Sequence, residues 1–230
     1  MEMVNKLSRH DNPKVLIPKS SYNIKNDPRI LIPYMIGDRI GFINRENVVI
    51  VEPKFAAYFG EFYNNVDMIK VAIIDTYGYS RMNGRVSTYH RLAYGVLNAQ
   101  GNLVIEPKYL CLIPSIVGTV LFAVQNNNYQ YGVIDADNKT IVPFGKYSWI
   151  DGFDHGLARV IINTEKHSKF GIIDENGNEV LPVIYDNIWN FYGKNKETTI
   201  ATTNGIIGEI SLKSLREENT KSTSYDELPF

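Results

Sequence analysis

The feature that most constrains the fold of this chain is a short motif that occurs five times along its 230 residues. The motif is an aromatic or aliphatic residue, a glycine and a run of aliphatic residues that ends in a small polar residue. Its copies are Tyr131–Asp135, Phe170–Asp174, Tyr94–Asn98, Ile40–Asn44 and a more degenerate one at Ile207–Ser211. Their glycines are 54, 37, 39 and 37 residues apart. A nearly fixed period of this length predicts a repeat architecture.

A second landmark, a proline followed by an aromatic residue, accompanies each of the first four glycines. The aromatic residue comes 14 or 15 residues after the glycine, and the pairs are Pro53/Phe55, Pro107/Tyr109, Pro143/Tyr147 and Pro182/Tyr185. Between the two landmarks lie turn residues such as Asn176-Gly177 and a second apolar run, which together predict a β-hairpin. We expect the proline to end the second strand, because it has no N–H to donate to a ladder.

The third copy shows what completes a unit. A short strand near Trp149 and a returning strand over residues 157–162 follow the hairpin, so the sequence predicts four strands per unit in an antiparallel meander. Aromatic and β-branched residues are frequent, which fits pleated sheets better than helices.

The two ends of the sequence carry incomplete units. Val15–Lys19, with Tyr22, has the pattern of a proline strand without a glycine strand before it, whereas Gly208 and Tyr225 begin a unit without its remainder. Because the two pieces are complementary, the sequence favours an all-β, propeller-like closed ring of about five units over an open β-array.

The same pattern sets the expected domain organisation. We expect residues 1–14 to form a peripheral N-terminal extension and residues 15–230 to form a single repeat domain. The polar stretch Ser214–Ser224 is predicted to be a solvated hairpin loop of the last unit.

These motifs resemble the WG-repeat family, also called KWG repeats. The best unit runs through Tyr131–Asp135, Ile141–Pro143, Tyr147 and Phe153–Val160, and the resemblance covers residues 15–228. The sequence departs from the pattern because Tyr, Phe or Ile, never Trp, precedes the repeat glycine, and only the third copy keeps the Gly-Leu-Ala return. The resemblance implies a β-repeat fold found mostly in bacterial proteins, a binding role, and no catalytic residues to carry over.

The composition narrows the classes of function. A net charge of −1 argues against nucleic-acid binding, which needs clustered positive charge. Cys111 is the sole cysteine, so no internal disulfide is possible, and it has no companion at redox or metal spacing. There is no apolar run of about 18 residues, and the first residues lack the apolar core of a signal peptide. We expect a cytoplasmic protein that does not enter a membrane.

Candidate chemical sites are weak. His155 lies in a turn with Asp151 and Asp154, which permits a metal interpretation, yet turn-forming chemistry explains the same residues better. A similar choice applies to the polar residue at the end of each glycine strand, where Asx turns are favoured over a ring of oxygen ligands: Asn44, Asn98, Asp135 and Asp174. We interpret the landmark aromatics as packing residues. The sequence therefore predicts no catalytic, cofactor or metal site, and no enzyme.

One segment breaks the repeat. The first glycine spacing is 17 residues longer than the second, and the excess falls between Asp75 and Tyr94. Asn83-Gly84 is a strong hairpin-turn signal, so we predict an elongated two-stranded arm. Pairing outward from that turn gives the register Met82/Arg85, Ser80/Ser87, Gly78/Tyr89 and Thr76/Arg91.

The arm is the predicted partner-binding site. Alternation along the strands puts one group of side chains on one face, Tyr77, Tyr79, Arg81 and His90, and a second group on the other, Arg85, Tyr89 and Arg91. Tyr and Arg are enriched at binding hot spots. A tolerated surface insertion explains the segment equally well.

The leading hypothesis is a non-enzymatic protein-interaction module that binds a partner protein through its loops and this arm. The alternative is a small-ligand or glycan-binding β-repeat protein that uses aromatic pockets between units.

Overall fold

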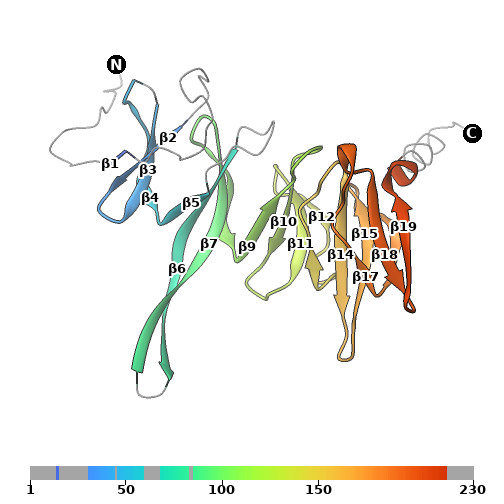
Figure 1. Ribbon diagram of the computed structural model, residues 1–230. Coiled ribbons are helices and arrows are strands. Elements are labelled where there is room, and N and C mark those ends of the chain that lie inside the picture. The colour runs from blue at the N-terminus through green and yellow to red at the C-terminus, as the bar shows by residue number, and fades with distance from the viewer. Residues whose placement is uncertain (1–13, 16–30, 45, 60–67, 83–84, 217–230) are drawn as a thin grey trace, which may run out of the picture. The chain divides into compact units, whose positions relative to one another are not determined.

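The computed structural model describes residues 14–15, 31–44, 46–59, 68–82 and 85–216, and this part of the chain is built of short β-strands (Figure 1). The strands form five antiparallel sheets, and within each sheet neighbouring strands follow one another along the chain. The predicted all-β repeat architecture is therefore confirmed. Within these ranges, no helix has the length and apolar character that a membrane crossing requires.

The chain divides into two compact units, Met1–Leu112 and Ile113–Phe230. The first unit contains two four-stranded sheets. Sheet 1 consists of β1 (Lys14–Val15), β2 (Ile32–Ile36), β3 (Arg39–Ile43) and β4 (Val49–Phe55). Sheet 2 consists of β5 (Ala57–Phe59), β6 (Met68–Met82), β7 (Arg85–Asn98) and β8 (Leu103–Tyr109).

The remaining three sheets follow, and the boundary between the two units falls inside the strand β9. Sheet 3 consists of β9 (Cys111–Pro114), β10 (Leu121–Gln125), β11 (Tyr131–Asp135) and β12 (Thr140–Val142). Sheet 4 consists of β13 (Trp149–Ile150), β14 (Leu157–Asn163), β15 (Ser168–Asp174) and β16 (Glu179–Tyr185). Sheet 5 has three described strands, β17 (Asn187–Ile188), β18 (Thr198–Thr203) and β19 (Ile206–Ser211).

The sequence repeat and the sheets are out of phase. The repeat glycine lies in the third strand of every sheet, at Gly41, Gly95, Gly132, Gly171 and Gly208. The glycine and proline strands of one copy therefore complete one sheet, and the short and returning strands of the same copy begin the next. The predicted four-stranded meander is confirmed, with a sheet boundary that the period alone could not place.

Asx turns hold the hairpins that join the third and fourth strands, as predicted. In each, a side-chain oxygen accepts hydrogen bonds from the backbone N–H groups two and four residues further along, at N···O distances of 2.8–3.1 Å. The four residues that do this are Asn44, Asn98, Asp135 and Asp174. Because these oxygens are used in turns, they are not arranged as a set of metal ligands.

The landmark proline does not end its strand in three of the sheets, contrary to expectation. Pro53, Pro107 and Pro182 lie inside β4, β8 and β16. The register shifts there, so that one glycine faces three residues of the proline strand. A bulge leaves a residue outside the ladder, which is where a residue without an N–H is tolerated.

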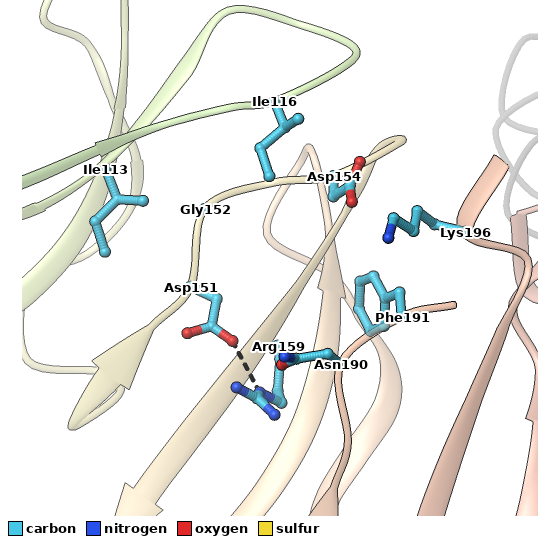
Figure 2. Close-up of a pocket in the computed structure, with 9 residues that line it drawn as sticks. All are labelled: Ile113, Ile116, Asp151, Gly152, Asp154, Arg159, Asn190, Phe191 and Lys196. Carbon is cyan, nitrogen blue, oxygen red and sulfur yellow. Dashed lines mark hydrogen bonds and ion pairs between the residues drawn. The ribbon is translucent and has the colours of Figure 1, made fainter. Parts of the chain in front are cut away.

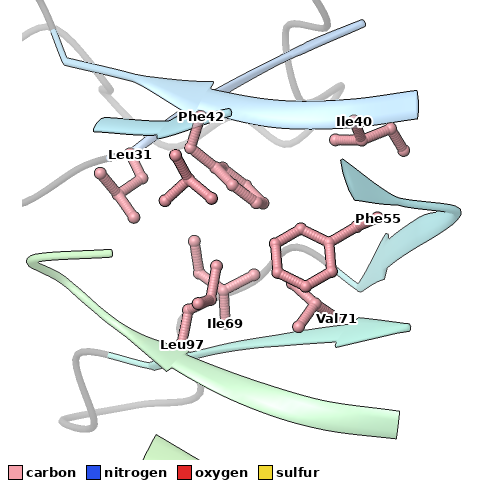
Figure 3. Packing of buried hydrophobic residues seen from close by; sticks show 8 residues of the cluster. Leu31, Ile40, Phe42, Phe55, Ile69, Val71 and Leu97 are labelled. Atoms are coloured by element: carbon pink, nitrogen blue, oxygen red, sulfur yellow. The ribbon is translucent and has the colours of Figure 1, made fainter. Parts of the chain in front are cut away.

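The cores lie between consecutive sheets. In the first unit, side chains of sheet 1 face side chains of sheet 2 in a buried cluster (Figure 3): Leu31, Ile40, Phe42, Val51, Phe55, Ile69, Val71 and Leu97. In the second unit, sheets 4 and 5 share another cluster: Leu157, Ile172, Leu181, Ile188, Ala201 and Leu212. In these two pairs, each sheet is thus stabilised by apolar burial against its neighbour along the chain.

The two ends differ from the sequence predictions. Val15 pairs with Tyr34 as part of the first strand of sheet 1, whereas the sequence placed it in a proline strand. Residues 212–216 are helical with Leu212 fully buried, so the start of the predicted loop Ser214–Ser224 is wrong. The physical reason is that Leu212 fills the core under sheet 5. Residues 1–13, 16–30 and 217–230, including the rest of that loop, lie outside the described residues.

Candidate interaction site

The arm predicted from the sequence is formed by β6 and β7. Tyr77 pairs with His90, and the four predicted pairs from Thr76/Arg91 to Met82/Arg85 are all present, so the predicted register is confirmed. The neighbouring strands of the sheet do not follow it, because β5 pairs with residues 70–72 and β8 with residues 94–97. Figure 1 shows β6 and β7 continuing together past the rest of their sheet. Among the described residues, the arm is therefore a two-stranded ribbon whose two outer edges pair with no other strand of its sheet.

A β-bulge marks the point where the arm leaves the sheet. The register shifts by one between Ile74 and Thr76, which leaves Asp75 as the extra residue. The carboxylate of Asp75 accepts a 2.8 Å hydrogen bond from Nε of Arg91 and pairs with Nη2 of the same guanidinium. Arg91 is thus held at the base of the arm. The sequence did not predict this partner, because Asp75 precedes the first predicted cross-strand pair, Thr76/Arg91.

The first face of the arm presents aromatic side chains. The rings of Tyr77 and His90 meet edge to face, with centroids 4.9 Å apart, as cross-strand neighbours on one face do. Tyr77 remains 62% exposed and Tyr79 76% exposed. The side chain of Arg81, predicted on this face, lies outside the described residues.

The second face is built around a glycine. A Cβ added at Gly78 would lie 2.1 Å from Cζ of Tyr89, so the tyrosine ring lies across the glycine backbone and a larger residue at this position would displace the ring. Tyr89 is still 56% exposed. Arg91 belongs to this face through the pairing with Thr76, and the side chain of Arg85 lies outside the described residues.

The other residues considered as sites have structural partners. Nδ1 of His155 lies 2.7 Å from Oδ1 of Asp154, whereas Asp151 pairs with Arg159, so the two carboxylates of this turn do not converge on one point. In the described ranges, no group of three or more His, Cys, Asp or Glu side chains could hold a metal ion. Cys111 is a half-buried free thiol in β9.

The landmark aromatics Phe55, Tyr109 and Tyr147 are buried, and Tyr185 is partly buried against the core of sheets 4 and 5. Burial supports their interpretation as packing residues.

Sequence reasoning missed a pair of equivalent cations that tie one sheet to the next. Nζ of Lys70 donates to the carbonyl oxygen of Leu112 at 3.2 Å, and Nη1 of Arg159 donates to that of Ile188 at 2.6 Å. Both cations come one residue before the partner of the repeat glycine, and both carbonyls come three residues after the landmark aromatic. The sequence gives no fixed spacing that would have found them, because Lys70 precedes Gly95 by 25 residues and Arg159 precedes Gly171 by 12.

The ammonium group of Lys70 loses part of its hydration at this position. Its ammonium lies 4.6 Å from the ring centroid of Phe59 and 5.3 Å from that of Tyr94. Burial lowers the pKa of Lys70, and the nearby Cys111 thiol acts in the opposite direction. The carbonyl and the two rings offset part of the lost hydration.

A pocket of about 380 Å³ lies in the second unit (Figure 2). Ile113, Ile116 and Phe191 supply apolar lining, and Asp151 and Arg159 form an ion pair in it. Asp154, Asn190, Gly152 and Lys196, the last residue of the 3-10 turn η3 (Lys194–Lys196), complete it. The combination of an apolar surface and a few fixed polar groups is that of a small-ligand site.

The family comparison accounts for the repeat. A family model described as WG containing repeat matches residues 40–71, 94–109, 131–163 and 170–195. These four segments are WG-containing repeats. Each matched segment of this WG-repeat chain begins at the residue before a repeat glycine. The arm falls in the unmatched stretch 72–93, so the family pattern does not explain it. No curated protein matches the chain.

Proposed function

We propose that this WG-repeat chain is a non-enzymatic protein-interaction module, in which a β-repeat platform binds a partner protein through its loops and the arm. The observation that carries the proposal is the exposure of Tyr77 and Tyr79 on a ribbon that no third strand of the described sheet covers. Large exposed aromatics that the fold does not use are typical of interaction surfaces.

The arm has the properties that a binding element needs. Its bulge and the Asp75–Arg91 pair fix where it leaves the sheet, and Tyr89 packed over Gly78 stiffens the ribbon. Rigid tyrosines lose little side-chain entropy on binding, and each ring that a partner buries would contribute about 1–3 kcal/mol. A protein partner is favoured over nucleic acid because the net charge is −1. We place this partner in the cytoplasm, since a lone free cysteine fits a reducing compartment.

Affinity capture followed by direct binding tests the arm. Partners captured from the source organism with the wild-type chain are expected to be lost when residues 76–91 are replaced by a tight turn. The dissociation constant of the purified partner should then rise at least about tenfold for the double variant Tyr77→Ser/Tyr79→Ser. Tyr129→Ser is the matched control, because Tyr129 is 68% exposed outside the arm. Retention of every partner after replacement of the arm would refute the proposal.

The alternative function, binding of a small ligand or glycan, is supported by the pocket of the second unit. Phe191 offers a ring on which a sugar or base could stack, and Lys196 and Asn190 offer hydrogen-bond donors. Thermal-shift measurements with a panel of sugars and nucleotides test it. A stabilisation that Phe191→Ala abolishes would favour this function, whereas no shift across the panel would count against it.

The arrangement of the sheets is a separate proposal. The sequence favours a closed ring of about five units, and the alternative is an open array. We propose the open array, because the ring used Val15–Lys19 as a closing proline strand, whereas Val15 pairs within sheet 1. Small-angle scattering distinguishes the two, since a ring gives one compact peak in the pair-distance distribution and an array gives an extended tail.

A further inference from the structure

The repeat glycine has one structural role in four of the five sheets, which is to let the fourth strand pass close over the third. If each glycine carried a Cβ, that atom would lie within 3.0 Å of a carbonyl oxygen of the fourth strand. The oxygens are those of Val51, Ile105, Val142 and Leu181, at 2.5, 2.5, 3.0 and 2.8 Å. In sheets 1 and 2 the nitrogen of the landmark proline is also within 3.0 Å of that position.

The fifth repeat glycine, Gly208, does not have this neighbour. No atom of the described residues lies within 4 Å of the position that its Cβ would take, and its φ is not positive. Neither close packing nor backbone conformation therefore explains a glycine at this position in β19. The feature that requires glycine in the other four sheets is the backbone of the fourth strand, which passes close over the third strand and is bulged there in sheets 1, 2 and 4.

The outer edge of β19 is open among the described residues. β19 pairs with β18 on its other side, and no described strand continues sheet 5 beyond it. Ile206 and Ile207 are 71% and 68% exposed. The chain does not return along this edge directly, because residues 212–216 form a helix held by buried Leu212. An exposed edge with aliphatic side chains is a template for another strand.

We propose that the outer edge of β19 accepts an extended strand of a partner protein, in which two or three aliphatic residues are followed by a proline in a bulge. The fourth strands of sheets 1 to 4 show what such a strand looks like. An example is β8, Leu103–Tyr109, with the sequence Leu-Val-Ile-Glu-Pro-Lys-Tyr. The bound strand adds backbone hydrogen bonds to β19, and its bulged backbone passes over Gly208 where a side chain would block it. This surface is independent of the arm.

A peptide made from the chain's own fourth strand is the probe. A labelled peptide with the sequence of residues 102–109 is added to the full-length protein, and binding is followed by fluorescence anisotropy. We expect saturable binding, together with slower amide exchange in residues 206–211. In the free Gly208→Val protein, the added side chain faces open space among the described residues. In the complex, it would collide with the backbone of the bound strand. The affinity of this variant for the peptide should fall at least about tenfold, whereas its melting temperature should be at or above that of the wild type.

The controls separate this surface from others. Lys213→Ala changes an exposed residue next to β19 and should bind as the wild type does, and a scrambled peptide should not bind. Failure of the wild type to bind, or equal binding by Gly208→Val, would overturn the proposal. Self-association of the wild type that Gly208→Val abolishes would also overturn it, because the occupant would then be a second copy of this chain.

Discussion

The role assigned to the repeat glycine predicts opposite effects for the same substitution at two equivalent positions in the second unit. At Gly171, the Cβ of an alanine would lie 2.8 Å from the carbonyl oxygen of Leu181 and 3.1 Å from Cα of Val183. Both contacts are with backbone, so β16 itself must move away from β15. At Gly208 the same methyl group meets no atom of the described part of the chain within 4 Å.

The size of the contrast can be estimated from these contacts. Replacing glycine by alanine in a strand stabilises the folded state by about 0.5–1 kcal/mol through backbone entropy, and this term applies at both positions. Overpacking against a backbone that cannot rotate away costs about 1–3 kcal/mol, and this term applies only at Gly171. The two variants should therefore differ in unfolding free energy by about 1–3 kcal/mol, with Gly208→Ala the more stable.

Urea unfolding followed by tryptophan fluorescence measures this difference directly, because Trp149 and Trp189 both lie in the second unit. With a slope of about 1–3 kcal/mol per molar urea, the midpoints should be separated by roughly 1 M. Equal midpoints for Gly171→Ala and Gly208→Ala would refute the claim that close approach of the fourth strand selects glycine.

Three further predictions concern the remaining contacts. Arg159→Met leaves Asp151 without its ion pair and should destabilise the second unit by about 1.5–3 kcal/mol in the same urea assay, whereas a loss below 0.5 kcal/mol would contradict the tie between sheets. Asp174→Ala removes two hydrogen bonds of an Asx turn and should cost about 1 kcal/mol, and Asp174→Asn should restore most of it. Burial and the hydrogen bond to Glu179 raise the pKa of the Tyr147 hydroxyl, so the folded protein keeps a proton that the unfolded chain releases above about pH 10. The stability that this group contributes is complete below that pH and is lost as the pH rises further. The variant Tyr147→Phe should therefore lose less unfolding free energy at alkaline pH than the wild type. An identical dependence of unfolding free energy on pH in the two proteins would show that another group causes the loss.

The sequence predicted the features that local chemistry decides. Asn44 and its equivalents close their turns through side chains only two to four residues from the atoms they bind, so short sequence windows contain the whole interaction. The arm was predictable to the residue because the Asn83-Gly84 sequence predicts a hairpin turn, and counting outward from it gives each cross-strand pair.

The features that the sequence did not predict depend on contacts between distant segments. The period locates each glycine strand but not the sheet to which the following short strand belongs. Pro107 was expected to end β8. That expectation was wrong because a bulge tolerates the proline, and this bulge forms only against Gly95 of the neighbouring strand. Lys70 and Arg159 were overlooked because their acceptors lie 42 and 29 residues away. The helix after β19 was missed because a burial site for Leu212 exists only once the sheets are packed.

The offset between repeat and sheet has a consequence for how such chains change length during evolution. Since each copy contributes two strands to one sheet and two strands to the next, an in-register duplication of one copy supplies one complete additional sheet, wherever its ends fall. The flanking sheets keep their full number of strands, because half of each is replaced by equivalent strands of the new copy. Arrays of this kind can therefore grow or shrink in steps of 37 to 39 residues, the range of three of the four glycine spacings of this chain, while their terminal edges stay the same.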